Sequence, residues 1–449
     1  MSPRQRPQVR PPQPWNFPRS RTIELDNGVR VLLYHLPGQY VVSAGLLLDV
    51  PANAEPTQLE GVATLAAATL SEGTATHPGT SFAEAVEACG GVIDATTGYS
   101  HFHVLVDVPG AQLPTALGLL AEATMEPTLA DADVERHRTI LAAQIEHQLA
   151  TGAGRANHAL RRALVDPGSR ASRMKSGEPE TLARVTGADV RAHRETYFGP
   201  DRSVLILSGD FDQPHVDAAV EVLGAWQNPR QQRAPHENPG TRAPAAYLVD
   251  RPGSVQADVR VGWFTIDRTD PRWPDLEIAG NALGGAYLSR LNRVLREEKG
   301  FTYGASLVLA PLRDGGYTYA QGSFRNEVVG QALELVPELL DTEASPITAD
   351  EVTRARDYLT GTSPLRYATA SGVTTGVLSL MAVGLDAGFV DAQLRAYRRV
   401  TPESASHAAK ELVDPAHSTL VVVGDAGALE PQLRAAGWDP RVVPAGEWI

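Results

Sequence analysis

Cysteine is nearly absent from this sequence. Of its 449 residues only Cys89 is a cysteine, so no disulfide can form within the chain, and nothing points to an oxidising compartment. Cys89 lies in an apolar helical stretch, and we expect an inert core thiol rather than a nucleophile. Long apolar runs are also missing, because no stretch approaches the roughly 18 apolar residues that span a bilayer.

Positive charge is in short supply as well. The chain has 40 lysine and arginine residues against 53 aspartate and glutamate residues, a net charge of −13. This excess of negative charge argues against nucleic acid and against an anionic membrane surface as partners. Residues 1–22 are rich in proline and arginine and lack the apolar segment of a secretory signal. We therefore expect residues 1–22 to form a disordered or strapping arm, and the protein to be cytoplasmic.

Strand and helix patterns alternate along the rest of the chain. A hairpin is predicted over residues 22–37, with its turn at Asn27-Gly28, and a buried strand over residues 40–50. Strand pairs are predicted over residues 92–108. Helices are expected over residues 61–74, 81–91, 115–125 and 131–150. This mixture predicts an α+β fold.

The second half of the chain repeats the first at a spacing of 215 residues. Pro37-Gly38 recurs as Pro252-Gly253. Residues 227–245, rich in proline, asparagine, glutamine and arginine, read as a polar linker. The repeat predicts two duplicated domains, residues 23–226 and 246–449. The other repeated residues are Val185, Thr186, Pro200, Ser203, Gly209 and Asp210, which recur as Val400, Thr401, Pro415, Ser418, Gly424 and Asp425.

The predicted helix GVATLAAATLSEGT, residues 61–74, carries the frame of a metal-binding motif. It resembles the signature helix of the pitrilysin/insulinase peptidases, or inverzincins, whose pattern is roughly G-x-A-H-x-x-E-H-x-x-x-x-G-T. In that family two histidines one helical turn apart bind Zn²⁺, and the glutamate is the general base on the metal-bound water. The matching residues are Gly61, Ala63, Gly73 and Thr74.

The residues that would carry the zinc chemistry are replaced. Thr64 and Ala68 occupy the two histidine positions, and Ala67 occupies the glutamate position. The family's third zinc ligand is a glutamate in a long helix, and its position falls on Gln144. Alanine cannot bind a metal, and threonine and glutamine are weak zinc ligands. The resemblance therefore implies a degenerate zinc site and no metal bound by this chain. The residues that match the long helix are Glu135, Arg136, Ile140, Leu141 and Ile145.

A second motif lies in the other half. SRLNRVLREEKGFTYGAS, residues 289–306, resembles the family's C-terminal substrate-binding motif. Arg296 and Tyr303 match an arginine and tyrosine pair that holds the substrate carbonyl and its oxyanion. The alternative is structural, with Arg296 a solvated charge at a helix end and Tyr303 a strand residue.

The resemblance implies the non-catalytic, substrate-binding subunit of a heteromeric zinc endopeptidase. Arg296 and Tyr303 would act in trans on peptide held at the zinc of a homologous partner chain. The two chains would form a clamshell, as a heterodimer or a dimer of heterodimers. The implied fold is a pair of duplicated mixed-sheet domains forming half of that clamshell, and the implied ligands are unfolded or extended peptides. The alternative is a non-enzymatic scaffold of the same fold, like the core proteins of the mitochondrial respiratory complex.

Overall fold

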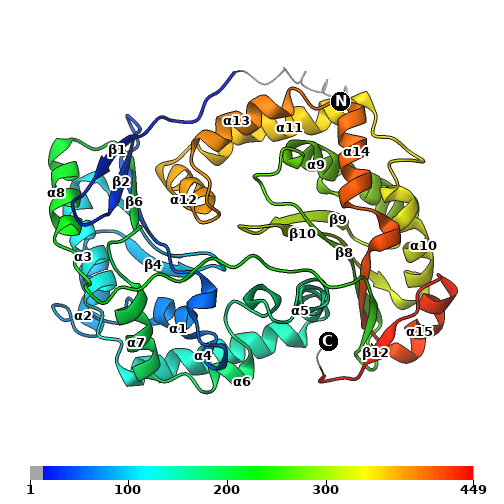
Figure 1. Cartoon of the computed structure of the whole chain (residues 1–449), viewed down its shortest axis with the longest axis horizontal. Coiled ribbons are helices and arrows are strands. Elements are labelled where there is room, and N and C mark those ends of the chain that lie inside the picture. The colour runs from blue at the N-terminus through cyan, green and yellow to red at the C-terminus, as the bar shows by residue number, and fades with distance from the viewer. Residues whose placement is uncertain (1–13, 448–449) are drawn as a thin grey trace, which may run out of the picture.

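Two similar halves, each built on a six-stranded mixed sheet, make up the chain in the computed structural model, which describes residues 14–447 (Figure 1). The first sheet has the order β1-β2-β6-β3-β5-β4 and the second β12-β7-β11-β8-β10-β9. The strands are β1 (Arg21–Glu24), β2 (Arg30–His35), β3 (Val41–Leu48), β4 (Val92–Thr97), β5 (Phe102–Pro109), β6 (Val204–Gly209), β7 (Ala246–Asp250), β8 (Gln256–Thr265), β9 (Ala305–Pro311), β10 (Gly316–Arg325), β11 (Thr419–Gly424) and β12 (Arg441–Val443).

The two sheets share five strands in the same order and direction. β2 pairs with β6 in parallel, as β7 does with β11, and the remaining shared neighbours are antiparallel. The sixth strand differs, because β1 is antiparallel to β2 whereas β12 is parallel to β7. The predicted α+β class with two mixed sheets is confirmed. As predicted, β1 and β2 form a hairpin, in which Gly28 has a φ of 95°.

Helices cover the two sheets in matching positions along the chain. The predicted helix over residues 61–74 is shorter than expected, because Thr74 pairs with Pro127 and the Gly73 carbonyl accepts a hydrogen bond from the Thr128 N–H. In the part of the chain that the structure describes, no helix combines the length and apolar character needed to cross a membrane. The helices are α1 (Val62–Thr69), α2 (Thr80–Ala88), α3 (Leu113–Met125), α4 (Asp131–Ala150), α5 (Gly152–Leu164), α6 (Pro179–Leu182), α7 (Gly187–Tyr197), α8 (Gln213–Gly224), α9 (Trp273–Gly280), α10 (Val329–Leu340), α11 (Ala349–Arg366), α12 (Ala370–Met381), α13 (Gly388–Tyr397), α14 (Pro402–Leu412) and α15 (Ala426–Ala435), with π-helical turns at Asn281–Gly285 and Asn292–Glu298.

The repeated residues of the sequence have the same structural task in each half. α7 and α14 are offset by 215 residues, as are β6 and β11. After β6, the Asp210 carboxylate accepts a hydrogen bond from the Gly38 N–H at 2.8 Å, and after β11 Asp425 does the same for the Gly253 N–H at 2.7 Å. These bonds join the turn before β3, or β8, to the end of the neighbouring strand. The repeat in the sequence therefore reflects a shared tertiary contact.

Each half places one helix on the sheet of the other half. α5, from the first half, packs on β8 and β11, and α12, from the second half, packs on β3 and β6. Both helices can be followed in Figure 1, where α5 (teal) lies below the second sheet and α12 (orange) lies beside the first. The largest buried cluster accordingly includes Tyr34 and Ile206 from the first half with Val377 and Leu378 of α12. The hydrophobic core is continuous between the halves.

Glycine allows α12 to approach the first sheet closely. Gly45 lies in the middle of β3, and a Cβ atom there would come within 2.7 Å of Thr374 Cγ2 and 2.8 Å of Leu378 Cδ1. The Thr374 hydroxyl also lies 2.9 Å from the Ser208 hydroxyl of β6. The helix therefore touches the backbone of the sheet as well as its side chains.

The polar linker, residues 227–245, runs along the first half. Asn53 donates a hydrogen bond to the Pro235 carbonyl, and Asp49 binds the His236 ring at 2.6 Å. Val165 and Thr241 form an isolated antiparallel bridge. These contacts hold the linker against the surface of the first half.

The N-terminal arm, expected to be disordered or a strap over residues 1–22, is described only in part. Residues 1–13 lie outside the described residues, but Trp15 and Phe17 in the part that follows pack against the second half. Phe17 is buried, and its N–H donates a hydrogen bond to Asp391 of α13 at 2.8 Å. Trp15 stacks on Tyr367 with its ring parallel. These two aromatic side chains make apolar contacts that a proline-rich and arginine-rich composition does not predict. This part of the arm is therefore a strap that packs on the second half.

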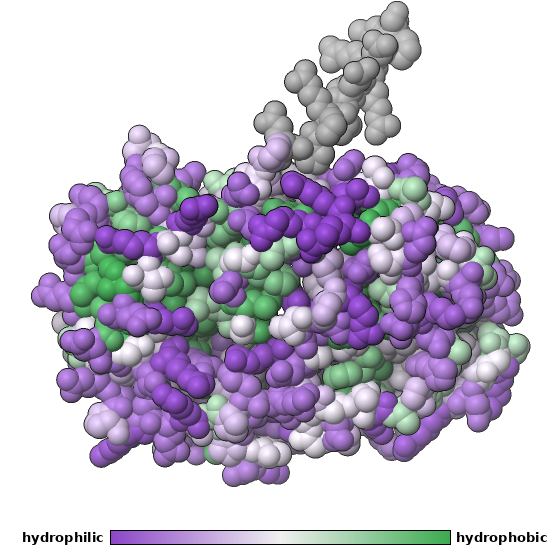
Figure 2. Space-filling view, turned by 45° about the horizontal axis from the view of Figure 1, so that its top comes forward, coloured by the Kyte–Doolittle hydropathy of each residue, from purple (hydrophilic) through white to green (hydrophobic). Residues whose placement is uncertain are grey.

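Hydrophilic side chains cover most of the face of the molecule drawn in Figure 2. Apolar residues appear there as separate patches. The larger apolar side chains are concentrated in three buried clusters, two of which combine residues of both halves.

We expect Gly45→Ala to lower the free energy of unfolding by about 1–3 kcal/mol, because the new methyl group must displace Thr374 or Leu378 in a packed core. Gly118→Ala is the matched control, since Gly118 lies in α3 with nothing within 4 Å of its Cβ position. The control should be neutral or stabilising by up to about 1 kcal/mol. Urea denaturation measures both, and equal midpoints for the two variants would show that α12 does not press on β3.

Candidate functional site

The helix α1 begins at a glycine that no other residue can replace. Gly61 has a φ of 104°, and a Cβ atom there would lie 2.5 Å from the Ser176 carbonyl oxygen. Both the left-handed backbone and the lack of space therefore require glycine. Val62, Leu65 and Ala66 follow as buried residues, which explains why an alanine-rich segment forms a core helix.

The positions of the predicted degenerate zinc site lie on two neighbouring helices. Thr64 and Ala68, one turn apart on α1, are half-buried, and Ala67 is buried. Gln144 is exposed on α4, which packs against α1. The Thr64 hydroxyl donates a hydrogen bond to the Lys175 carbonyl at 3.3 Å.

These side chains do not fit a zinc ion. Ala67 and Ala68 present only methyl groups, and the Thr64 hydroxyl is engaged by the backbone of Lys175. Zinc sites are built from imidazole, thiolate and carboxylate ligands, which this set lacks. Within residues 14–447, no three histidine, cysteine, aspartate or glutamate side chains gather in a way that could hold a metal ion.

A buried network of charges holds the start of α1. Oε1 of Glu55 accepts hydrogen bonds from the Gly61 and Ala63 N–H groups at 3.2 and 2.9 Å, while its Oε2 accepts from Arg170 at 2.8 Å. A carboxylate at a helix N-terminus also interacts favourably with the helix dipole. Burial raises the pKa of Glu55, and the Arg170 guanidinium and both N–H groups oppose that rise.

The neighbouring segment extends this network to the edge of the sheet. Arg173 donates to Glu60, which is 1% exposed, at 2.7 to 2.9 Å. The Lys175 ammonium donates to the carbonyl of Thr97, the last residue of the edge strand β4, at 3.1 Å. Burial lowers the pKa of Lys175. The segment thus connects the face of α1 that bears Thr64 to the end of β4.

In the second half, the predicted substrate motif is anchored by Arg290. Its guanidinium makes two 2.8 Å hydrogen bonds to Glu351 of α11 and donates to the carbonyls of Ser345 and Pro346. Arg290 is 6% exposed. The pair is therefore a buried, bidentate ion pair that fixes the start of the motif against α11.

Arg296 lies in the π-helical turn Asn292–Glu298 and stacks on an aromatic ring. Its guanidinium carbon lies 3.9 Å from the centre of the Tyr287 ring. Its Nε donates to Glu297 at 2.8 Å, and its Nη2 to the Tyr287 carbonyl at 3.3 Å. The guanidinium is held in place near the surface, with 16% of the side chain exposed.

Tyr303 lies in the loop before β9 and not in the strand, with 96% of its surface exposed. Among the described residues it is not a hydrogen-bond partner of Arg296, whose contacts are with Tyr287 and Glu297. The structure therefore places Tyr303 in solvent and Arg296 partly buried near the surface, and the two side chains are not hydrogen-bonded to each other among the described residues.

Two features were missed by sequence reasoning. The first is the stacking of Arg296 on Tyr287, for which the sequence offers one indication, an aromatic residue nine positions before the arginine. The ion pairs of Glu55 and Glu60 with Arg170 and Arg173 had none, because more than 100 residues separate the partners in the chain.

Glu351→Gln tests the anchor of the motif through its pH dependence. Burial disfavours the ionised Glu351, but hydrogen bonds from Arg290 and Thr348 outweigh it and lower its pKa from 4.5 to about 2. We expect the variant to lose about 2–3 kcal/mol of unfolding free energy near pH 7. Since the folded pKa lies below the unfolded one, this stabilisation is complete above about pH 5 and is lost as the pH falls from about 4.5 to about 2.

Urea denaturation at several pH values measures the difference between wild type and Glu351→Gln. Glu297→Gln is the control, because the Glu297 side chain is 51% exposed and should contribute at most about 1 kcal/mol. A difference for Glu351→Gln that persists unchanged near pH 3 would contradict the assignment to the ion pair.

Comparison with known proteins matches both halves of the chain to one peptidase family. Residues 30–171 match the family model described as insulinase (peptidase family M16), and residues 184–359 match the peptidase M16 inactive domain. Together the two matches cover more than two thirds of the chain.

Relatives with similar sequences extend over nearly the whole chain. The chain is 25% identical over 438 residues to the uncharacterized zinc protease Mb2805c of Mycobacterium bovis, covering 92% of this chain and 96% of the relative. It is 23% identical over 349 residues to the zinc protease YmxG of Bacillus subtilis, covering 75% and 81%. Human cytochrome b-c1 complex subunit 1 is 24% identical over 208 residues, covering 46% of this chain and 43% of the subunit.

Solved structures with the same fold include a peptidase M16 inactive domain from Pseudomonas fluorescens, with a TM-score of 0.83 and 20% identity over 91% of this chain and 98% of the other. Complex III2 from Candida albicans contains a chain that matches with a TM-score of 0.77 and 14% identity over 93% and 99%. With its duplicated mixed sheets and the two family matches, the chain belongs to the pitrilysin/insulinase family, peptidase family M16.

Proposed function

We propose that this protein is the non-catalytic, substrate-binding subunit of a two-chain zinc endopeptidase. The zinc ion would be bound by a homologous partner chain, and this chain would bind none. Its ligands would be unfolded or extended peptides. We also infer a cytoplasmic location, in line with the single cysteine of the chain.

The observation that carries this proposal is the exposure of Tyr303. A tyrosine that is 96% exposed, on a loop beside the helix that holds Arg296, has its phenol available to another molecule. Arg296 is partly exposed and is preorganised by its stacking on Tyr287. A fixed cation and a phenol donor are the groups that stabilise a developing oxyanion.

The first half supports a division of labour between two chains. α1 has Thr64, Ala67 and Ala68 where zinc chemistry needs two imidazoles and a carboxylate. The frame of the helix is nevertheless retained, including Gly61 with its left-handed backbone. The helix α1 keeps the residues that shape the zinc motif but has no zinc ligands, while Arg296 and Tyr303 are accessible to another molecule. This combination fits a subunit whose residues complete the active site of a partner chain.

A scaffold without enzymatic function is the second candidate. It is favoured by the similarity to cytochrome b-c1 complex subunit 1, a component of a multisubunit assembly. A scaffold would need the shape of the fold but neither Arg296 nor Tyr303. Activity measurements on these two residues therefore separate the candidates.

The isolated protein should bind no stoichiometric zinc, because α1 and α4 offer no donor set at Thr64, Ala67, Ala68 and Gln144. Elemental analysis after dialysis against a zinc buffer measures the metal content. Restoring the family pattern with Thr64→His, Ala67→Glu, Ala68→His and Gln144→Glu provides the positive control. One tightly bound zinc per wild-type chain would contradict the degenerate site.

Together with its nearest zinc-motif homologue, this chain should support cleavage of a quenched fluorescent peptide that neither chain cleaves alone. Arg296→Ala or Tyr303→Phe should lower turnover by about 10²-fold or more, because each removes an oxyanion-binding donor. Tyr358→Phe is a matched control for Tyr303→Phe, since Tyr358 is also exposed but lies on α11. A stable complex in which both variants keep wild-type turnover would favour the scaffold.

A further inference from the structure

The N-terminal strap, residues 14–20, joins the two halves of the chain. It leads into β1 and so belongs to the first half, but it contacts α13 and the end of α11 in the second. Figure 1 shows this segment in dark blue, running from β1 toward α13. The strap is therefore an extension of one half that is bound to the other.

Phe17 is the central residue of the strap, and it lies between the halves. It is 5% exposed. Its ring meets Tyr34 of β2 edge-to-face, with 5.8 Å between the ring centres, and meets Tyr367, directly after α11, at 4.9 Å. Its N–H donates a hydrogen bond to Asp391 of α13 at 2.8 Å. One residue of the strap thus contacts the first sheet and two helical segments of the second half.

Trp15 makes the outer contact of the strap. Its ring stacks on Tyr367 with 5.9 Å between the centres, and it meets Phe17 edge-to-face at 6.2 Å. Both arrangements are favoured by aromatic pairs. By contrast, α12 buries a whole face, residues 370–380, against the first sheet. Because local opening occurs where few buried contacts must be broken, the strap should be released more readily than α12.

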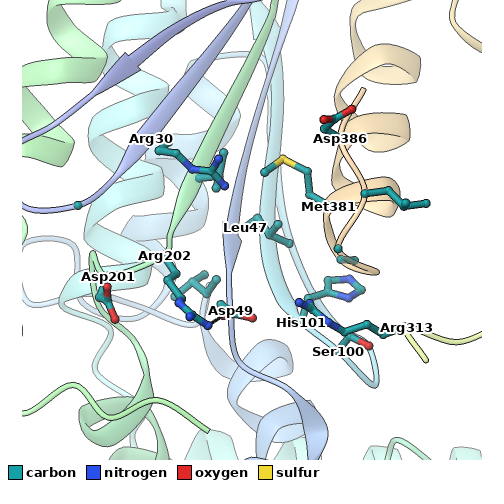
Figure 3. Close-up of a pocket in the computed structure, with 16 residues that line it drawn as sticks. Arg30, Leu47, Asp49, Ser100, His101, Asp201, Arg202, Arg313, Met381 and Asp386 are labelled. Carbon is teal, nitrogen blue, oxygen red and sulfur yellow. Dashed lines mark hydrogen bonds and ion pairs between the residues drawn. The ribbon is translucent and has the colours of Figure 1, made fainter. Parts of the chain in front are cut away.

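The segment that the strap holds forms one wall of a cavity of about 540 Å³ (Figure 3). Met381, at the end of α12, and residues of the connection to α13 line this wall, while residues of β2, β3 and β6 line the opposite one. In Figure 3, Met381 and Asp386 lie across the cavity from Arg30 of β2. The width of the cavity therefore depends on where the connection between α12 and α13 is held.

The strap and this wall meet at Tyr34. The Tyr34 side chain is buried and packs on Phe17. Burial raises the pKa of Tyr34, a hydrogen bond with Ser20 opposes the rise, and the negative charge of Asp386 adds to it. Ser20 of the strap and Asp386 of the cavity wall thus interact with the same tyrosine.

We propose that the strap is a clasp that regulates the width of this cavity. While Phe17 is seated between Tyr34 and Tyr367, the connection between α12 and α13 is held toward the first sheet. When the strap is released, the connection moves away from β2 and β3 and the cavity widens, while the middle of α12 stays packed at Gly45. The clasp belongs to this chain alone and does not depend on the proposed zinc-bearing partner.

Hydrogen exchange of the wild-type, full-length chain tests the proposal without any mutation. The N–H groups of Phe17, Phe389 and Val390 are all hydrogen-bonded, so each exchanges when its bond opens. We expect their protection factors to agree within about threefold and to lie at least about tenfold below that of Ala44 in the central strand β3. A Phe17 N–H as protected as Ala44, or one that exchanges freely while α13 stays protected, would overturn the proposal.

Phe17→Ala should accelerate exchange of residues 384–390 at least about tenfold and leave β3 and residues 370–378 unchanged. Trp15→Ala, which removes a half-buried ring, should give the same pattern with a smaller rise. Phe324→Ala is the matched control, because Phe324 belongs to the same buried cluster but lies in β10. It should accelerate exchange in the second sheet without selecting residues 384–390. The same pattern for Phe17→Ala and Phe324→Ala would overturn the proposal, since the connection would then respond to any loss of core packing.

Cysteine labelling measures the width of the cavity directly. Leu47→Cys places a thiol on the β3 wall at a position that is 6% exposed, and the native Cys89 is buried. Adding Phe17→Ala should raise the labelling rate of the Leu47→Cys variant at least about tenfold. Val255→Cys is the control, because Val255 is 78% exposed and its labelling rate should not depend on Phe17. Equal rates for Leu47→Cys with and without Phe17 would overturn the proposal, and circular dichroism establishes that each variant is folded.

Discussion

The reciprocal packing of α5 and α12 is the constraint on which the rest of this structure depends. Each helix leaves its own half and buries its apolar face on the opposite sheet, so the hydrophobic core runs through both halves. Gly45 allows α12 to touch the backbone of β3, and Gly262 does the same for Leu160 of α5 on β8. Burial of apolar surface contributes about 25 cal/mol per Å², and here it opposes any separation of the halves. The polar linker needs only to connect them.

This packing determines how the two family motifs are placed relative to one another. α1 and its charged network belong to the first half, whereas the Arg290–Glu351 pair fixes the other motif to α11 in the second. Both are held by buried ion pairs with several hydrogen bonds each, the arrangement in which a buried charge is tolerated. For the same reason a cavity lies between the halves, lined by residues of β2, β3 and β6 from the first half and by the connection between α12 and α13 from the second.

The two family motifs differ in the side chains that they keep. In α1, the side chains that would meet a metal are small and uncharged, and the surrounding polar groups bind one another. In the second half, Arg296 rests on Tyr287 and Tyr303 extends into solvent, so charge and hydrogen-bonding capacity remain at the surface. A stable protein fold does not require an exposed phenol. The proposed role of this M16-family chain in binding substrate rests on that contrast.

The sequence by itself determined the α+β class, the duplication and the family, because these depend on local periodicity and on residues with a direct backbone role. Asp210 and Asp425 illustrate this. Each carboxylate accepts a hydrogen bond from a glycine N–H 172 residues earlier in the chain. Because the aspartate and the glycine both recur 215 residues later, the contact is visible in the sequence as a repeat. The composition left open whether the arm that carries Trp15 and Phe17 is disordered or a strap, because their partners, Tyr367 and Asp391, are remote in sequence. Only the tertiary structure decided that α5 packs on the second sheet and α12 on the first, and that Glu55 pairs with Arg170. These depend on which surfaces meet after the halves pack, and a linear pattern does not contain that information.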